Sequence, residues 1–358
     1  MTAGARFRQG LVVGKFSPLH RGHEWLVRQA ASACERLLVL SYSQPALPGC
    51  DTATRARWMS ACLTRANPGI DCLALDDTEM QARCAERGVP WQPLPLNEAA
   101  DEVHQRYLGW MLREVLEVTP DALFTSELWG PTCAQTLAQV AGRPVYSVQV
   151  DVARQHVPIS ATRIRHDPQA HRVWLSPAVW ADFVPRVVLL GGESSGKTTL
   201  ARALAEALQT EWVPEYGREL WERRGGHLDA ADLQFIAEEQ VRREDRAATR
   251  ARAHLVCDTS PLTTLGYSLW LFGQAPAALQ ALAERRYALH VLCAPDMPFE
   301  QDGTRRDAAF RDQQHRWYLE RCAALQAQGH AVCHVRGSVA QRVACVQAVL
   351  AAQGLGKQ

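Results

Sequence analysis

The stretch RVVLLGGESSGKTTLARALAEAL, residues 186–208, decides how the second half of this chain folds. It begins with a short apolar run that is typical of a buried strand, and it continues through a glycine-containing loop into an Ala- and Leu-rich segment. We therefore predict a strand over Val187–Leu190 and a helix over Leu200–Leu208. A strand, loop and helix in this order are typical of an α/β protein with a parallel sheet.

The loop of this unit, Gly191–Thr198, matches the phosphate-binding pattern GxxxxGK[ST]. Its glycines allow successive backbone N–H groups to turn toward a phosphate. Lys197 is expected to reach the β- and γ-phosphates of ATP, and the Thr198 hydroxyl is expected to bind Mg²⁺. Other residues of the motif that we expect to bind the nucleotide are Gly191, Ser194, Ser195, Gly196 and Thr199.

Two later segments carry acids that a phosphotransferase needs. HLVCDT, residues 254–259, is typical of a strand that ends in an acid, and Asp258 is expected to hold Mg²⁺. VPEYGRE follows a second predicted strand, where an acceptor substrate lies in sheets of this kind. There, Glu215 and Arg218 are candidates for binding a sugar hydroxyl. Both Glu215 and Asp258 remain candidates for the base that accepts the hydroxyl proton.

A polar segment near the C-terminus, QDGTRR at residues 301–306, contains a glycine and paired arginines. We interpret it as a lid whose arginines, Arg305 and Arg306, neutralise the transferring phosphoryl group. The alternative is a solvated loop.

A second strand–glycine–helix unit begins at GLVVGKFSPLHRGH, residues 10–23. His20 and His23 lie three residues apart across a predicted loop-to-helix junction, so that both rings can face one phosphate beside a helix N-terminus. The chemistry that this serves is attack of a phosphate oxygen on the α-phosphorus of a nucleoside triphosphate, which needs donors and positive charge around phosphorus. Lys15 would balance the triphosphate. Gly14 and Phe16 are further nucleotide-binding candidates of the loop.

The segment ISATRIR, residues 159–165, is typical of a helix start with Ser160 or Thr162 as its cap. Alone it would indicate an ordinary N-cap. Together with the histidine loop, the hydroxyls of Ser160 and Thr162 and the Arg165 guanidinium predict a second clamp for the triphosphate.

The remaining structural predictions are local. We expect two domains, residues 1–183 and 184–358, each long enough to bury its own core. Further expected elements are strands over Leu11–Val13, Arg36–Ser41, Ala122–Ser126 and Pro144–Val150, helices over Glu24–Cys34 and Thr132–Ala141, a solvated charged helix over Asp229–His254 and a loop over the first site at Met80–Glu102.

Composition limits the functional classes. The 39 basic and 38 acidic residues give a net charge of +1, which argues against a general nucleic-acid binder. Lysine occurs only at positions 15, 197 and 357, so that two of the three lysines lie in the two motifs. The 11 cysteines show no CxxC spacing and are expected to be buried free thiols of a reducing cytosol. No signal peptide or membrane-spanning run is present, and we expect a cytoplasmic protein without membrane contact.

The motifs and their order resemble a known family. GKFSPLHRGH with ISATRIR resembles the nucleotidyltransferase superfamily of adenylyltransferases. The series GKFSPLHRGH, LFTSELWG, PISATRIRHDP and then a P-loop kinase resembles the NadR-type bifunctional proteins. This resemblance implies two α/β domains with parallel sheets, a Rossmann-like nicotinamide mononucleotide adenylyltransferase followed by a ribosylnicotinamide kinase. It also places Ser126, Glu127 and Trp129 near the substrate, where Trp129 stacks on a base or packs in the core.

The implied reactions are phosphorylation of nicotinamide riboside by ATP and adenylylation of the resulting mononucleotide to NAD, both with Mg²⁺. Some family members carry an N-terminal helix-turn-helix, for which the first strand leaves no room here, so we expect no DNA binding. Self-association is plausible. Two alternatives stay open: the same architecture acting on another nucleoside or phosphorylated acceptor, and a nucleotide-sensing regulator with a decayed transferase site.

Overall fold

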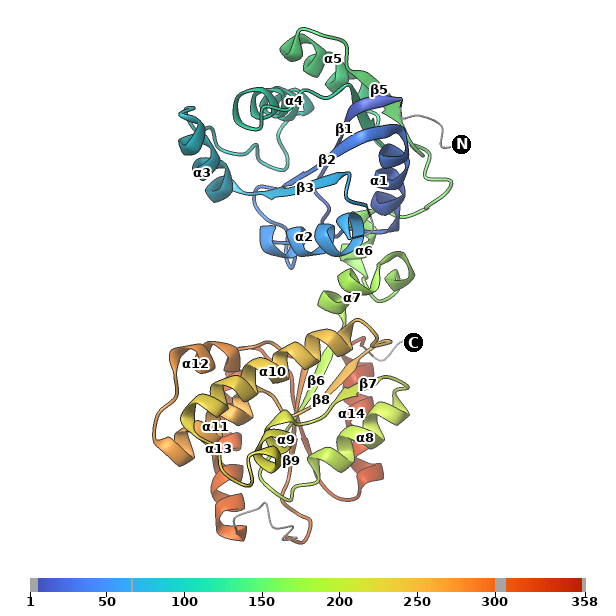
Figure 1. Ribbon diagram of the computed structural model, residues 1–358. Helices are drawn as coiled ribbons and strands as arrows, with labels where there is room; N and C mark the ends of the chain where they lie inside the picture. The colour runs from blue at the N-terminus through green and yellow to red at the C-terminus, as the bar shows by residue number, and fades with distance from the viewer. Residues whose placement is uncertain (1–5, 66, 300–306, 356–358) are drawn as a thin grey trace. The chain divides into compact units, whose positions relative to one another are not determined.

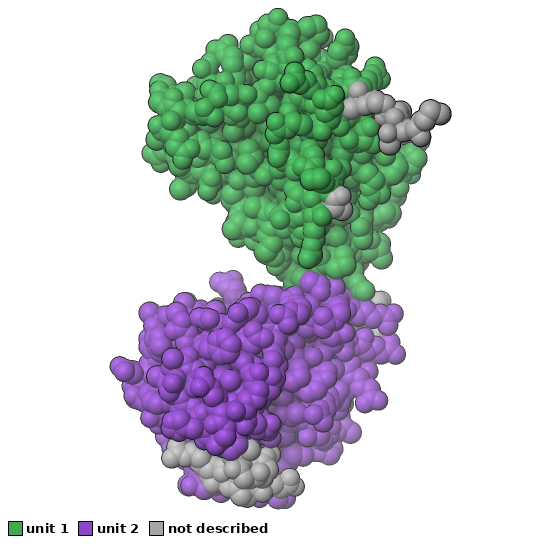
Figure 2. Space-filling model, viewed as in Figure 1, with its two compact units in different colours: residues 1–182 green, residues 183–358 purple. Residues whose placement is uncertain are grey.

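A computed structural model describes residues 6–65, 67–299 and 307–355 of the chain. The chain divides into two compact units, Met1–Asp182 and Phe183–Gln358 (Figures 1 and 2). The predicted boundary between the two domains, after residue 183, lies one residue later than the boundary between these units. Each unit contains a five-stranded sheet in which all strands are parallel, so the prediction of an α/β fold with parallel sheets is confirmed.

The sheet of unit 1 has the strand order β3-β2-β1-β4-β5. Its strands are β1 (Phe7–Gly14), β2 (Cys34–Tyr42), β3 (Ile70–Leu75), β4 (Ala122–Thr125) and β5 (Tyr146–Gln149). The helices of the unit are α1 (Arg21–Ala33), α2 (Thr52–Met59) with a π-helical end η1 (Ser60–Thr64), α3 (Asp77–Arg87), α4 (Asp101–Trp110) with a π-helical end η2 (Met111–Val115), α5 (Gly130–Ala141), α6 (Ala161–His166), the 3₁₀ turn η3 (Arg172–Trp174) and α7 (Pro177–Phe183).

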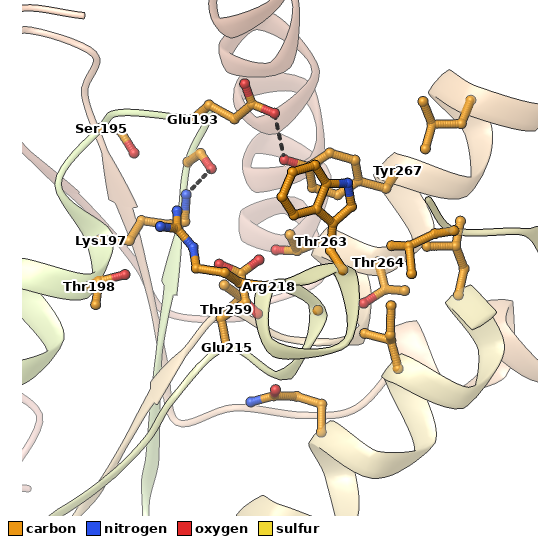
Figure 3. Close-up of a pocket in the computed structure, with 18 of the residues that line it drawn as sticks. Glu193, Ser195, Lys197, Thr198, Glu215, Arg218, Thr259, Thr263, Thr264 and Tyr267 are labelled. Atoms are coloured by element: carbon orange, nitrogen blue, oxygen red, sulfur yellow. Dashed lines mark hydrogen bonds between the residues drawn. The ribbon is translucent and has the colours of Figure 1, made fainter. Parts of the chain in front are cut away.

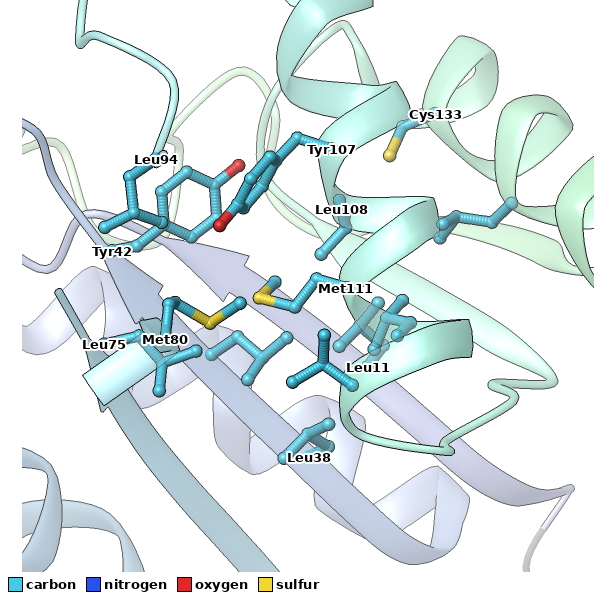
Figure 4. Packing of buried hydrophobic residues seen from close by; sticks show 14 of the residues in the cluster. Leu11, Leu38, Tyr42, Leu75, Met80, Leu94, Tyr107, Leu108, Met111 and Cys133 are labelled. Atoms are coloured by element: carbon cyan, nitrogen blue, oxygen red, sulfur yellow. The ribbon is translucent and has the colours of Figure 1, made fainter. Parts of the chain in front are cut away.

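The central strand β1 is buried on both faces. The consecutive β1 residues Leu11 and Val12 point to opposite sides of the sheet, and both are completely buried. On the Leu11 side, the core is made with side chains of α3 and α4, among them Met80 and Leu108 (Figure 4). Because β1 is fixed in this way, the loop after Gly14 is held at the carboxyl edge of a rigid sheet.

The sheet of unit 2 has the strand order β10-β9-β6-β8-β7. Its strands are β6 (Arg186–Leu190), β7 (Glu211–Val213), β8 (Leu255–Asp258), β9 (Leu289–Cys293) and β10 (Val332–Val335). The helices are α8 (Lys197–Ala207), α9 (Tyr216–Arg223), α10 (Ala230–Ala248), α11 (Pro261–Phe272), α12 (Ala277–Ala283), α13 (Ala308–Ala327) and α14 (Val339–Ala352). Helices α8 and α14 pack side by side, and α10, α11 and α12 form a separate group (Figure 1).

Two local predictions are wrong in part. The region Met80–Glu102 is not one loop, because α3 continues to Arg87 and ends at Gly88, whose φ of 66° suits a left-handed helix cap. The predicted helix over Asp229–His254 ends at Ala248, because the chain must turn back to enter β8 parallel to its neighbours. None of the helices in the described ranges combines the length and apolar character that crossing a membrane requires.

Candidate active sites

The loop between β1 and α1 brings His20 and His23 together. His20 is the N-cap of α1, where its Nδ1 accepts a hydrogen bond from the Gly22 N–H at 3.1 Å. The two imidazole rings are stacked with centroids 3.7 Å apart and planes at 26°. The rings of Phe16 and His23 meet at nearly right angles with centroids 4.9 Å apart. The two rings therefore form one surface at the start of a helix, as the spacing predicted.

The surroundings of both histidines favour the neutral form of the ring. Burial lowers the pKa of His20 to about 4, and the charge of Arg154 contributes. Burial, followed by the neighbouring His20, holds the pKa of His23 well below its usual range. Since Nδ1 of His20 accepts the Gly22 N–H, the neutral ring carries its proton on Nε2 and can donate it to a phosphate. Nδ1 of His23 is buried and has no hydrogen-bond partner among the described residues.

Helix α6 contacts the same loop. Ser160 caps this helix by accepting the Arg163 N–H at 3.3 Å, which resolves the choice of cap in favour of Ser160 over Thr162. The Arg165 guanidinium donates to the backbone carbonyl of Ser17 and, at 3.1 Å, to the Thr162 hydroxyl. Two motifs that lie far apart in the sequence therefore meet at one edge of the sheet.

A cavity of about 400 Å³ opens beside this loop. Its walls include His23 and the expected nucleotide-binding residues Gly14, Lys15 and Phe16, and also the three residues that the family resemblance placed near the substrate, Ser126, Glu127 and Trp129. Trp129 lines the cavity and also packs against the core of unit 1, so the predicted core packing is observed and the stacking on a base stays a prediction. Aromatic and acidic side chains share the walls, including Tyr42, Asp101, Glu127 and Trp129.

Two further residues of this site were not predicted from the sequence, Asn97 in the cavity wall and Arg55 in the protein interior. Asn97 lies in the segment that follows α3, and its backbone carbonyl accepts a hydrogen bond from Lys15 Nζ at 3.0 Å. Arg55 is completely buried, and its guanidinium donates at 2.8 Å to the Ser41 hydroxyl, which in turn donates to the Lys15 carbonyl at 3.0 Å. Helical spacing could have revealed Arg55, because Trp58 and Met59 share its buried face. No local signal marks Asn97.

The second loop, between β6 and α8, has the conformation of a phosphate cradle (Figure 3). Ser194 and Gly196 have φ angles of 53° and 80°, which turn the backbone around the loop. The Ser195 hydroxyl donates to the Gly192 carbonyl at 2.7 Å. Lys197 Nζ donates to the carbonyls of Gly191 and Gly192 at 2.8 and 2.9 Å, so the ammonium lies across the mouth of the loop, where a phosphate would accept its protons instead.

A cavity of about 530 Å³ adjoins the cradle. Its polar lining comes from the loop together with Glu215, Arg218 and Thr259. Its apolar lining comes from Trp221, Leu228, Leu233, Ile236 and Leu271. Tyr267 also lines the cavity and donates its hydroxyl to Glu193 at 3.0 Å (Figure 3). The sequence analysis missed Trp221 and Tyr267, because their approach to the loop depends on how α9 and α11 pack.

Asp258 and Glu215 occupy different places in this site. Asp258 is 1% exposed, does not line the cavity, and has no hydrogen-bond partner for either carboxylate oxygen among the described residues. Burial raises its pKa, and the nearby Thr198 hydroxyl and Lys197 charge oppose that rise. Glu215 lines the cavity, and burial raises its pKa as well, against the opposing charge of Lys197.

The unpartnered oxygens of Asp258 beside the Thr198 hydroxyl fit a Mg²⁺ ion that takes its other ligands from nucleotide phosphates and water. Within the described ranges, no group of three or more His, Cys, Asp or Glu side chains could hold a metal by itself. Thr199 is exposed on α8 and does not line the cavity. Arg305 and Arg306, the predicted lid arginines, lie outside the described residues.

Comparison with known proteins agrees with this layout. A family described as an AAA domain matches residues 186–342. The trifunctional NAD biosynthesis/regulator protein NadR of Escherichia coli strain K12 is 28% identical over 304 residues, which cover 83% of this chain and 71% of that protein. The protein of the same name from Salmonella typhimurium is 29% identical over 309 residues with the same two coverages.

Solved structures show the same fold. A NadR protein in complex with NAD and AMP-PNP aligns with a TM-score of 0.69 and 20% identity, covering 100% of this chain and 99% of that one. A NadR protein in complex with NR aligns with a TM-score of 0.68 and 21% identity, covering 98% and 97%. The resemblance that the motif order predicted is therefore confirmed, and the chain is a relative of the NadR proteins over most of its length.

Proposed function

We propose that the chain is a two-step enzyme of NAD biosynthesis. Unit 2 phosphorylates nicotinamide riboside with ATP, and unit 1 transfers the adenylyl group of a second ATP to nicotinamide mononucleotide, which releases pyrophosphate. The observation that carries the proposal is that one chain, similar to NadR proteins, contains two loops with phosphate-binding motifs, each beside its own cavity.

The chemistry of the two cavities supports a pyridinium substrate. The nicotinamide ring of the riboside and of the mononucleotide carries a positive charge, which aromatic faces and carboxylates attract. In unit 2 the cavity offers Trp221 and Tyr267 with Glu193 and Glu215. The cavity of unit 1 offers Tyr42 and Trp129 together with acidic residues at its walls. A neutral nucleoside would gain less from either site.

In unit 1 the protein needs no nucleophile of its own, because a phosphate oxygen of the mononucleotide attacks the α-phosphorus. The neutral rings of His20 and His23 donate hydrogen bonds to the triphosphate, and the start of α1 and the Arg165 guanidinium add positive potential. Lys15 is placed to exchange its bond to Asn97 for a phosphate oxygen.

The complete reaction tests the proposal. We expect mass spectrometry to detect NAD when the purified protein is supplied with nicotinamide riboside and MgATP, with nicotinamide mononucleotide as an intermediate. Adenosine and uridine serve as matched neutral nucleosides, which we expect to be phosphorylated far more slowly. Phosphorylation of another nucleoside in preference to nicotinamide riboside would favour the alternative in which the architecture serves different substrates. Absence of both reactions would favour a nucleotide-sensing regulator.

For the kinase reaction we propose a division of roles that the sequence left open. Asp258 would hold Mg²⁺ together with Thr198, because its carboxylate is buried near the Thr198 hydroxyl and neither of its oxygens has a hydrogen-bond partner among the described residues. Glu215 accepts the proton of the attacking hydroxyl, because its side chain lines the substrate cavity. The raised pKa of Glu215 matches a base that must hold a proton during transfer. When bound, Mg²⁺ neutralises charge on the β- and γ-phosphates.

Substitutions of the two acids are expected to differ in kind. Glu215→Gln should lower kcat for riboside phosphorylation by about a hundredfold or more and leave the Mg²⁺ concentration for half-maximal rate unchanged. Asp258→Asn should raise that Mg²⁺ concentration by about tenfold or more, since a charged ligand is lost. Steady-state rates measured across a magnesium titration check both outcomes. The reverse pattern would exchange the two roles.

A further inference from the structure

Arg342 is a charged side chain in the interior of unit 2. It lies in the first turn of α14 and is 1% exposed, which makes it one of the largest fully buried side chains of the protein. Removing a guanidinium from water costs free energy unless its donors are bonded and its charge is balanced. The partners of Arg342 therefore indicate what its burial accomplishes.

The guanidinium binds three backbone carbonyls and one carboxylate. Nε donates to Gly337 at 3.0 Å, Nη1 to Ser195 at 2.7 Å, and Nη2 to Ala294 at 3.2 Å. Nη2 also forms an ion pair with Asp296. The planar fork of arginine allows one side chain to serve acceptors in several directions, which the compact ammonium of lysine cannot reproduce.

These acceptors belong to three separate loops. Ser195 lies in the phosphate cradle after β6, Ala294 and Asp296 follow β9, and Gly337 follows β10. The three strands are neighbours in the sheet order β10-β9-β6. Asp296 also accepts the Gly337 N–H at 2.6 Å, so the two outer loops are joined to each other as well. Arg342 therefore fixes the cradle to the carboxyl edge of the sheet.

The bond to Ser195 has a direct consequence for phosphate binding. In a planar trans peptide, the carbonyl of one residue and the N–H of the next point in opposite directions. Arg342 binds the Ser195 carbonyl from the protein interior, so the N–H of Gly196 faces away from that interior. Gly196 lines the cavity beside the cradle, and its φ of 80° is held in the left-handed region.

We propose that Arg342 is a positioning residue of the kinase site, which directs the Gly196 N–H toward the phosphates of ATP by holding the Ser195 carbonyl. The proposal rests on the proposed kinase function of unit 2. Arg342 itself does not touch the nucleotide. Its contribution is made equally in the ground state and the transition state, because the cradle binds ATP throughout the reaction.

The first test is Arg342→Lys, because this substitution keeps the positive charge and removes the planar guanidinium that binds several acceptors at once. We expect the KM for MgATP in riboside phosphorylation to rise by about tenfold or more, which corresponds to the loss of one charge-assisted hydrogen bond. We expect kcat to change by less than about threefold and the KM for the riboside to stay constant, as uniform binding requires. Arg316→Lys, an exposed arginine on α13, makes the same chemical change and should leave all three constants unchanged.

The opposite result would be a lower melting temperature with an unchanged KM for MgATP. That result would show a purely structural role and overturn the proposal. If Arg342→Lys does not fold, Asp296→Asn carries the test, because it frees the guanidinium to move away from the carbonyls. We expect this variant to raise the KM for MgATP by about twofold to fivefold, and an unchanged KM would equally overturn the proposal.

A binding measurement separates this proposal from the proposed function. Calorimetric titration with a non-hydrolysable ATP analogue reports on both units, and the Lys197→Ala variant shows how much of the binding belongs to the cradle. Arg342→Lys should weaken the cradle component alone. If nicotinamide riboside proves not to be a substrate, the proposed function fails, and the change in analogue affinity still decides the role of Arg342.

Discussion

Lys197→Ala is expected to lower the rate of nicotinamide riboside phosphorylation by about a thousandfold, since the loss of a charge aimed at the transferring phosphoryl group costs two to three orders of magnitude. NAD formation from nicotinamide mononucleotide should be unchanged. The ammonium of Lys197 lies at the mouth of the cradle, bonded to the carbonyls of Gly191 and Gly192, and no other lysine among the described residues lies in unit 2. Separate assays of the two half-reactions, each started from its own substrate, measure both effects.

Glu206→Ala on the same helix, α8, is the matched control, because its side chain is exposed and does not line the cavity. It should leave both half-reactions unchanged. Loss of both activities in Lys197→Ala would mean that the two units do not act independently. Full retention of the kinase activity would mean that the P-loop is not where phosphoryl transfer takes place.

Prediction from the sequence worked best where short local patterns determine the secondary structure. The apolar runs at Leu11–Val13 and Val187–Leu190 became the central strands β1 and β6. They are buried on both faces, which makes a continuous apolar run a strong signal. Prediction from the sequence failed where the end of a helix depends on how the chain packs in the tertiary structure. Nothing in the charges of Asp229–His254 shows that α10 stops at Ala248, because that stop is imposed by the start of β8.

The same contrast applies to the sites. The positions of both glycine-containing loops could be predicted, because each is a contiguous motif that follows an apolar strand, whereas their binding of phosphate stays a prediction. Arg342 and Asn97 could not be predicted, because each acts through contacts with chain segments distant in the sequence. Neither residue belongs to a recurring sequence pattern. From the sequence alone, an arginine within an Ala- and Val-rich helix would be predicted to be exposed. Long-range partners of short motifs are therefore what the structure adds.

His23→Ala is expected to lower the rate of NAD formation from nicotinamide mononucleotide by about a hundredfold to a thousandfold, since one donor to the developing charge at phosphorus is removed. Riboside phosphorylation should be unchanged. His23 is the better of the two histidines to substitute, because its Nδ1 has no hydrogen-bond partner among the described residues, whereas His20 caps α1 by accepting the Gly22 N–H. Loss of His20 would combine a catalytic effect with a structural one.

His166→Ala is the matched control, since this histidine is exposed on α6 and does not line the cavity of unit 1. It should leave NAD formation unchanged. Pyrophosphate release measured at saturating mononucleotide separates the chemical step from acceptor binding. An unchanged rate in His23→Ala would remove the histidine pair from the mechanism. The positive potential at the start of α1 and the Arg165 guanidinium would then have to stabilise the transition state without it.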